Sequence, residues 1–171
     1  MKKKIIVCSI LLVLIVTGVV IGSYFYNRVT VNGSTTVAIR IGTDSSEKFI
    51  ESISEVPVGE KSSVSITTVL QSNREKKKTC KIEVMMEKSE IIDYDKVYIT
   101  GVRESSINIS DDKKKITYEA DVSKNTSATQ IKLIFNFVAL DEGSSRIVVT
   151  VYDPQGDVVL SACSEQIINF G

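Results

Sequence analysis

The sequence contains no histidine and no tryptophan, and only two of its 171 residues are proline. Histidine is the commonest general base near neutral pH and the commonest metal ligand, so its absence removes the usual basis of both chemistries. No serine stands in the Gly-x-Ser-x-Gly pattern of a nucleophile elbow. The acidic residues do not follow the regular ligand spacing of a calcium loop. We therefore expect no enzyme: no catalytic residue, no metal site and no cofactor.

Cysteine is also scarce, with three residues in the whole chain. Cys8 lies inside a hydrophobic run, where a small apolar residue suits a helix. Cys80 alternates in phase with Ile82 and Val84, which predicts that it faces the core. Cys163 lies on a mixed, wetter face. Two cysteines on an oxidising side of a membrane can pair, and the sequence leaves a Cys80–Cys163 disulfide open.

Charge is absent from residues 5–22, and three lysines precede this run. Eighteen helical residues span roughly 27 Å, close to the thickness of the hydrocarbon core of a bilayer. Aromatic residues follow at once, where an interfacial belt belongs. The residues that we expect to hold the chain in the membrane are Ile5, Leu11, Leu12, Leu14, Val20, Tyr24, Phe25 and Tyr26.

A cleaved signal peptide is the alternative to an anchor. Its apolar core is usually shorter, and the best cleavage position here, Gly22–Ser23 with Val20 before it, matches the small-residue pattern poorly. We favour an uncleaved signal-anchor. Lys2, Lys3 and Lys4 set the topology because positive charge stays in the cytoplasm, so the carboxyl-terminal part lies outside the cell membrane.

The rest of the chain is predicted to form one domain. Removing residues 1–22 leaves 149 residues, enough to bury a core without disulfides. All 21 acidic residues but only 18 basic ones lie in this part, which gives a net charge of −3 and argues against nucleic-acid binding. The expected division is a cytoplasmic tip at 1–4, a transmembrane helix at 5–26, a stalk at 27–36 and an extracytoplasmic domain at 37–171.

The hydrophobic period beyond Arg28 is two, which is typical of strands. Turn residues separate the runs, and Asn32-Gly33 has the composition of a hairpin turn. The strongest strand covers residues 131–139, and Val158, Leu160 and Ala162 suggest another late strand. The pattern predicts an all-β fold, an antiparallel β-sandwich of about eight or nine strands after one transmembrane helix.

Three stretches within residues 56–152 resemble cohesin-like and related bacterial surface β-sandwich modules. They are Val56-Pro57-Val58-Gly59-Glu60 leading into Val64-Ser65-Ile66, Ile92-Asp93-Tyr94-Asp95 leading into Val97-Tyr98-Ile99-Thr100-Gly101-Val102, and Phe135-Asn136-Phe137-Val138-Ala139-Leu140 followed by Gly143 and Ile147-Val148-Val149. The segment from Cys80 to Glu87 departs from the family, since it lacks the expected glycine and aromatic residues. The resemblance implies a non-enzymatic, surface-displayed sandwich that scaffolds or binds. It carries over no binding-face residue.

We therefore expect a structural or protein-binding module of the cell envelope, with the bilayer and a surface protein as partners. Binding of polysaccharide is one alternative, although the chain is poor in the aromatic rings on which sugars stack. A pilin-like filament subunit is another, and a helix that continues past residue 35 would favour it. The basic cluster from Arg74 to Lys78 suits anionic polymer or lipid head groups, but we favour a solvated loop between strands.

Overall fold

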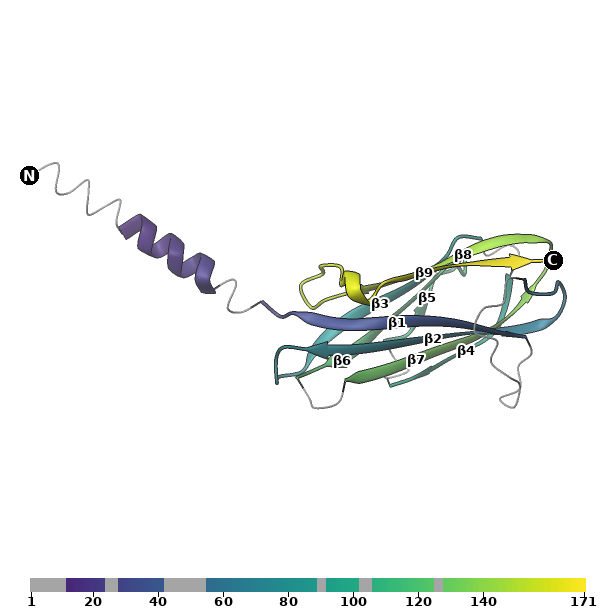
Figure 1. Ribbon diagram of the computed structural model, residues 1–171, viewed down its shortest axis with the longest axis horizontal. Coiled ribbons are helices and arrows are strands. Elements are labelled where there is room, and N and C mark those ends of the chain that lie inside the picture. The colour runs from purple at the N-terminus through teal and green to yellow at the C-terminus, as the bar shows by residue number, and fades with distance from the viewer. Residues whose placement is uncertain (1–11, 24–27, 42–54, 89–91, 102–105, 125–127) are drawn as a thin grey trace, which may run out of the picture.

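The computed structural model describes residues 12–23, 28–41, 55–88, 92–101, 106–124 and 128–171 (Figure 1). Two antiparallel sheets form the body of the protein, and a separate helix precedes it. The strands are β1 (Val31–Ile41), β2 (Lys61–Ser72), β3 (Lys78–Met86), β4 (Ile92–Thr100), β5 (Asn108–Ile109), β6 (Lys115–Val122), β7 (Thr129–Ala139), β8 (Gly143–Tyr152) and β9 (Ser164–Phe170). The predicted mostly-β sandwich is confirmed.

The helix covers residues 12–23. Leu12, Leu14 and Val20, three of the expected anchor residues, expose 65%, 64% and 60% of their surface. Among the described residues, no helix combines the length and the apolar character that crossing a bilayer requires. The expected span of 5–26 extends beyond this helix at both ends. Its other anchor residues (Ile5, Leu11, Tyr24, Phe25 and Tyr26) and the topology-setting lysines (Lys2, Lys3 and Lys4) lie outside the described residues.

The first sheet has the strand order β1-β2-β7-β4, and the second has the order β5-β6-β3-β8-β9. Every pairing within the two sheets is antiparallel. Partners come from distant parts of the chain, because Lys61 of β2 lies opposite Val138 of β7. Such pairing places segments side by side that are far apart in the sequence.

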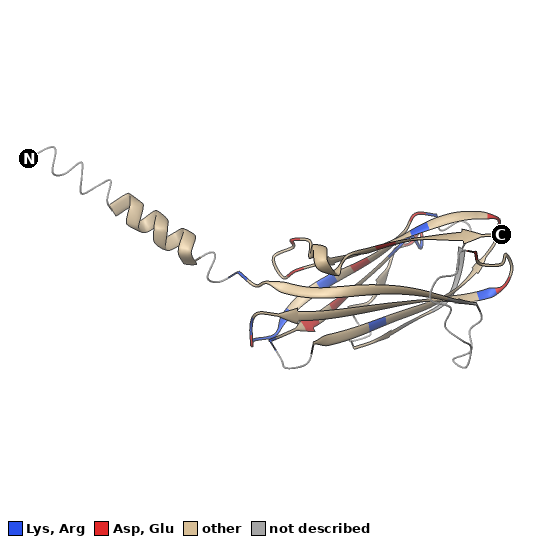
Figure 2. Cartoon of the chain, viewed as in Figure 1, with Lys and Arg blue, Asp and Glu red and all other residues tan. Residues whose placement is uncertain are grey.

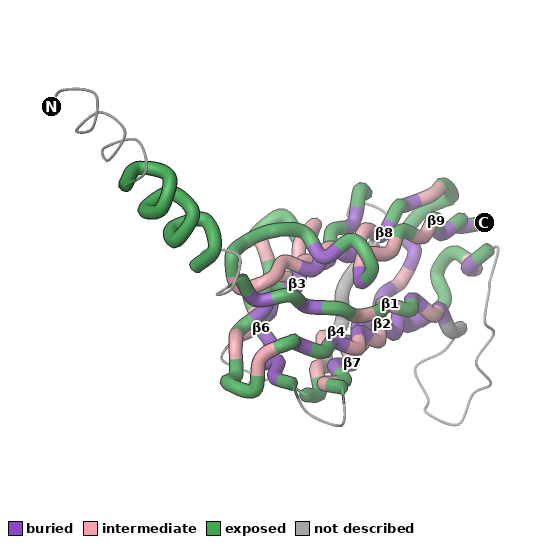
Figure 3. The backbone as a smooth tube through the Cα atoms, turned by 60° about the vertical axis from the view of Figure 1, so that its left-hand side comes forward, coloured by how far each residue is buried: buried purple, intermediate pink, exposed green. Residues whose placement is uncertain are grey.

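The core lies between the two sheets and is filled by every second residue of each long strand. Its largest fully buried side chains are Tyr118, Phe135, Phe137, Ile66, Leu70, Ile82, Met86, Ile116, Ile131, Leu133, Ile147 and Ile168. Phe137 packs edge-on against Phe170, with ring centroids 6.1 Å apart. Figure 3 shows the resulting alternation of buried and exposed positions along the strands.

Two local predictions are wrong. Asn32-Gly33 is not a turn, because both residues lie within β1. Gly33 is needed there because an added Cβ would collide with the backbone oxygen of Val69 on β2. Residues 158–162 do not form a strand, since Leu160–Ala162 is a 3-10 turn and Leu160 is 84% exposed.

The domain starts earlier than the sequence indicated. β1 begins at Val31, six residues before the expected boundary at residue 37, and Val29 and Val31 are already buried. The described residues between 28 and 36 are therefore packed against the body of the sandwich. The helix and the first strand of the sandwich are therefore close to each other in the sequence.

Candidate interaction surface

The outward face of the five-stranded sheet carries alternating charged and apolar side chains. Register places Met85 of β3 beside Lys115 of β6 on one side and Val148 of β8 on the other. Val148 in turn lies beside Glu165 of β9. Met85 is 44% exposed, which is unusual for a large apolar side chain in the middle of a sheet.

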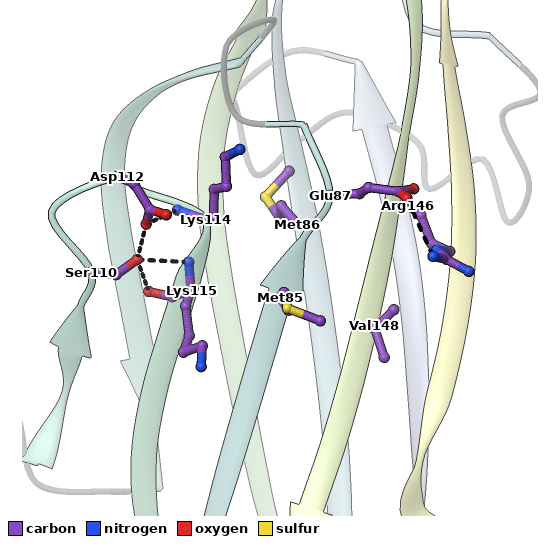
Figure 4. A pocket seen from close by; sticks show the side chains of 9 residues that line it. All are labelled: Met85, Met86, Glu87, Ser110, Asp112, Lys114, Lys115, Arg146 and Val148. Atoms are coloured by element: carbon purple, nitrogen blue, oxygen red, sulfur yellow. Dashed lines mark hydrogen bonds and ion pairs between the residues drawn. The ribbon is translucent and has the colours of Figure 1, made fainter.

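A pocket of about 380 Å³ opens on this face (Figure 4). It lies where β3 ends, at the end of the sandwich away from the helix. Met85, Met86 and Val148 give it an apolar lining. Its polar lining comes from Glu87, Ser110, Asp112, Lys114, Lys115 and Arg146. Methionine side chains are flexible and polarisable, so they adapt to the shape of a bound group. An apolar centre inside a polar rim is the usual anatomy of a protein interaction site.

Arg146 organises one rim of the pocket. Its guanidinium donates hydrogen bonds to Glu87, at 3.3 Å, and to Glu165, at 3.2 Å. The hydrogen bond to Glu165, followed by the charges of Glu87 and Glu165, raises the pKa of Arg146 above its ordinary value. The guanidinium therefore stays charged and is held in a fixed direction between two strands, where it can also receive a partner's acceptor.

The opposite rim is a tight turn between β5 and β6. The Ser110 hydroxyl donates to the Asp112 carboxylate at 2.6 Å, and the Lys114 backbone N–H donates to the same carboxylate at 3.1 Å. These hydrogen bonds, with Ser110 as the largest cause, lower the pKa of Asp112. Lys113 closes the turn with a positive φ of 56°. This rim therefore presents a fixed negative charge beside Lys114 and Lys115.

The middle of the face is a network of charges of both signs. Glu83 lies 3.4 Å from Lys81 and 3.5 Å from Lys115, and its side chain is only 15% exposed. The Lys81 ammonium also lies 5.3 Å from the centre of the Tyr152 ring. Ion pairs of exposed lysines, such as Lys81 and Lys115, add little stability, but they decide which partner charges are attracted or repelled.

Cys80 and Cys163 are both free thiols, so they form no disulfide with each other. As the alternation predicted, Cys80 is fully buried, whereas Cys163 is partly exposed. Burial, with a smaller contribution from the charge of Asp153, raises the pKa of Cys80 to about 11. The thiol therefore stays protonated at neutral pH and is a poor nucleophile.

The described residues give little support for a metal site, for a sugar-binding row of aromatic rings or for a pilin-like subunit. Among the described residues, no three side chains of the metal-binding types gather closely enough to hold an ion. Of the two tyrosines whose side chains are described, Tyr118 is buried and Tyr152 lies beneath Lys81, so these two form no row of exposed rings. Residues 31–41 form a strand, so the helix past residue 35 that would favour a pilin-like subunit is not formed.

Sequence reasoning did not single out Met85, Val148 or Arg146. One signal was available, because Met85 falls at an outward position of the run in which Cys80, Ile82, Val84 and Met86 face inward. A hydrophobic residue that breaks the alternation marks an exposed apolar site. The role of Arg146 depends on β3 and β9 lying on either side of β8, which the sequence does not reveal.

No protein-family model matches the chain, and no curated protein sequence matches it. Among solved structures, the C-terminal domain of the Streptococcus pyogenes antigen I/II-family protein AspA has a TM-score of 0.56 at 9% identity, covering 80% of this chain and 46% of that one. The C-terminal domain of the Streptococcus agalactiae AgI/II polypeptide BspA has a TM-score of 0.54 at 11% identity, covering 82% and 49%. The chain thus spans about half the length of these two structures.

A non-cellulosomal cohesin from the hyperthermophilic archaeon Archaeoglobus fulgidus also resembles the chain, with a TM-score of 0.45 at 13% identity and coverage of 81% of this chain and 91% of that one. The structural neighbours are therefore cohesin modules and bacterial surface β-sandwich domains, as the resemblance in sequence predicted. At these identities the likeness shows the fold alone, a β-sandwich.

Proposed function

We propose that this chain is a non-catalytic module that a membrane anchor holds at the outer side of a cell membrane, where its sandwich binds a protein. The observation that carries the binding function is the apolar patch of Met85 and Val148 inside a rim of fixed charges. The uncharged run at 5–22 behind three lysines supports the anchor and its orientation. Similar folds occur in surface proteins, which agrees with a display role.

The anchor concentrates the sandwich on a surface. A module confined in this way meets its partners at a high effective concentration, so a modest patch suffices for occupancy. The charges around the patch would choose among partners, since a mismatched charge facing Arg146 or Glu87 is costly. A fitting partner presents an apolar side chain for the pocket, flanked by an acceptor for Arg146 and by a cation for Asp112.

Site-specific cross-linking on intact cells tests the binding function. A photoreactive amino acid at Val148 is expected to give a discrete adduct with one envelope protein, and the Met85→Asp substitution should remove that adduct. The same photoreactive group at Thr36, an exposed position on β1 in the other sheet, is the matched control and should give no such adduct. Equal labelling from both positions, or labelling that survives Met85→Asp, would contradict this site.

Three further measurements separate the alternatives. The full chain should float with lipid vesicles, and the Leu14→Arg/Val20→Arg double variant should not, because a charge at the centre of a span, where Leu14 lies, costs about 2.5–3.5 kcal/mol and the charge at Val20 adds to that cost. Protease added to intact cells should digest the part after residue 30.

Retention on purified wall polysaccharide tests the carbohydrate-binding alternative. That alternative expects the protein to be retained, whereas the protein-binding proposal expects no retention.

A further inference from the structure

The end of the sandwich nearest the helix is built around the point where the chain enters β1. The Thr30 N–H donates to the side-chain oxygen of Asn73 at 3.0 Å, and the Asn73 N–H donates back to the Thr30 carbonyl at 3.0 Å. Asn73 is the residue before the basic cluster from Arg74 to Lys78. The hydrogen bonds therefore fix this loop, which joins β2 to β3, beside the segment that comes from the helix.

A second set of contacts fixes the same segment from the other sheet. Arg28 forms an ion pair with Asp157, and the Gln155 side chain donates to the Val29 carbonyl at 2.9 Å. Val20 and Ser23 of the helix line one hollow together with Lys78. The basic loop therefore lies on the side of the sandwich that faces the helix, as Figure 2 shows.

Two of the positive charges of the loop are available for a partner. Lys76 and Lys77 are exposed, and neither forms an ion pair with another of the described residues. Two carboxylates of the neighbouring turn are engaged elsewhere, since Asp157 pairs with Arg28 and Asp153 accepts the N–H groups of Gln155 and Asp157. Glu75, inside the loop, offsets one of its four positive charges. The loop thus has a local excess of positive charge on a domain whose net charge is negative.

The loop is also close to the membrane if the helix is anchored. Four peptide steps separate Tyr26, the last residue of the expected anchor, from Thr30, so that end of the sandwich lies within about 14 Å of the anchor's end. The Debye length is about 8–10 Å at moderate salt, which is comparable to this separation. Lysines at that height feel the negative potential of a leaflet that contains anionic lipid.

We propose that Lys76, Lys77 and Lys78 dock the sandwich against the anionic phospholipid leaflet in which its own helix is anchored. This inference rests on the proposed membrane anchor. Docking would hold the long axis of the sandwich upright and direct the Met85–Val148 pocket, at the opposite end, away from the bilayer. The loop is then a second membrane contact that orients the module rather than retains it.

The chain offers a clean reporter and a matched control. Since it contains no tryptophan, a single Glu75→Trp substitution in the basic loop gives a unique fluorescence donor. Glu142→Trp, in the turn between β7 and β8, makes the same change at the opposite end. The test variant is Lys76–78→Gln in the loop. Its matched control is Lys113–115→Gln at the far end, since both variants remove three positive charges.

Energy transfer to a dansyl-labelled lipid head group is measured on full-length protein in vesicles. With the Glu75→Trp reporter, transfer should be stronger in phosphatidylcholine–phosphatidylglycerol vesicles than in pure phosphatidylcholine and should fall when salt rises from 0.05 to 0.5 M. Each lysine near a charged leaflet changes the docked-to-free ratio roughly fivefold, so Lys76–78→Gln should lower that ratio roughly a hundredfold. Lys113–115→Gln and the Glu142→Trp reporter should show no such response.

Equal transfer in both lipids, or an equal loss from Lys113–115→Gln, would overturn the docking. Transfer that does not depend on the lysines, together with salt-sensitive binding of the loop to a soluble polyanion, would assign the loop to an anionic polymer instead and also overturn it. Failure of the unmodified chain to float with the vesicles would refute the anchor, and the docking with it. A chain that floats but shows no lipid-dependent transfer would refute the docking alone.

Discussion

At position 80 a thiol lies on the inward face of β3, where solvent does not reach it. Burial raises its pKa to about 11, from 9.0 in the absence of the fold. The neutral thiol is thus favoured in the folded protein, while the unfolded chain ionises from about pH 9. Its contribution to stability is complete below pH 9 and is lost as the pH rises towards 11.

The free energy of unfolding should consequently fall between pH 8 and pH 10, with about 1 kcal/mol of the loss due to Cys80. Cys80→Val should remove that part, and the difference between the two proteins cancels other groups that titrate in the same range. Urea unfolding at both pH values measures it, with Cys163→Ser as the control that keeps the dependence. An unchanged dependence in Cys80→Val would contradict the assignment.

The environments of single residues could be predicted in part from the sequence. The inward position of Cys80 followed from its phase with Ile82 and Val84, because alternation in a strand is a local property. The role of Arg146 could not be predicted, since Glu165 reaches it from β9 and Glu87 from the residue that follows β3.

Among the elements, β1 depends on Gly33, which the sequence predicted to lie in a hairpin turn. Gly33 lies opposite Leu70 in the pairing of β1 with β2. An added Cβ would meet the Val69 carbonyl oxygen and, at 2.6 Å, the Leu70 side chain. The strand pair is therefore close-packed at this point, which explains a glycine inside a strand.

Gly33→Ala should lower the free energy of unfolding by about 1–3 kcal/mol, since the two strands must separate to admit the methyl group. Ser34→Ala, at the next and exposed position, should change it by less than about 0.5 kcal/mol. Urea unfolding of both variants measures the difference. Equal stabilities would show that β1 and β2 are not packed as closely as described.

The sequence predicted the wrong element where the same residue pattern occurs in two kinds of local structure. Asn-Gly is common in hairpin turns, but here it lies in a strand because tertiary packing required the glycine. Val158, Leu160 and Ala162 have the alternation of a strand, yet the chain makes a 3-10 turn before β9. The long strands β2, β3, β7 and β8 were predictable because many alternating residues agree.

For the molecule as a whole, the last residues join the two sheets at the end away from the helix. Val56 donates its N–H to the Asn169 carbonyl at 2.8 Å and accepts the Gly171 N–H at 3.1 Å. Between these residues, Phe170 is only 4% exposed and packs against Phe137 of the other sheet. Closure of the sandwich therefore depends on the carboxyl-terminal strand.

Phe170→Ala should destabilise the protein by about 3 kcal/mol because it leaves a cavity between the sheets. Ile167→Ala is the control in the same strand: its side chain is 61% exposed, and the change should cost less than about 0.5 kcal/mol. Thermal or urea unfolding compares the two variants. Similar losses from both would mean that β9 does not close the core.

The sequence alone determined the class of fold and the uncharged run behind three lysines, because alternation, turn composition and hydrophobic length are local properties of a chain. Only the tertiary structure decided which strands are neighbours. It thereby brought Met85 beside Val148, placed Arg146 between two glutamates and set the basic loop at the end that faces the helix. Contacts between residues far apart in the chain depend on how the whole core packs, and no local pattern encodes them.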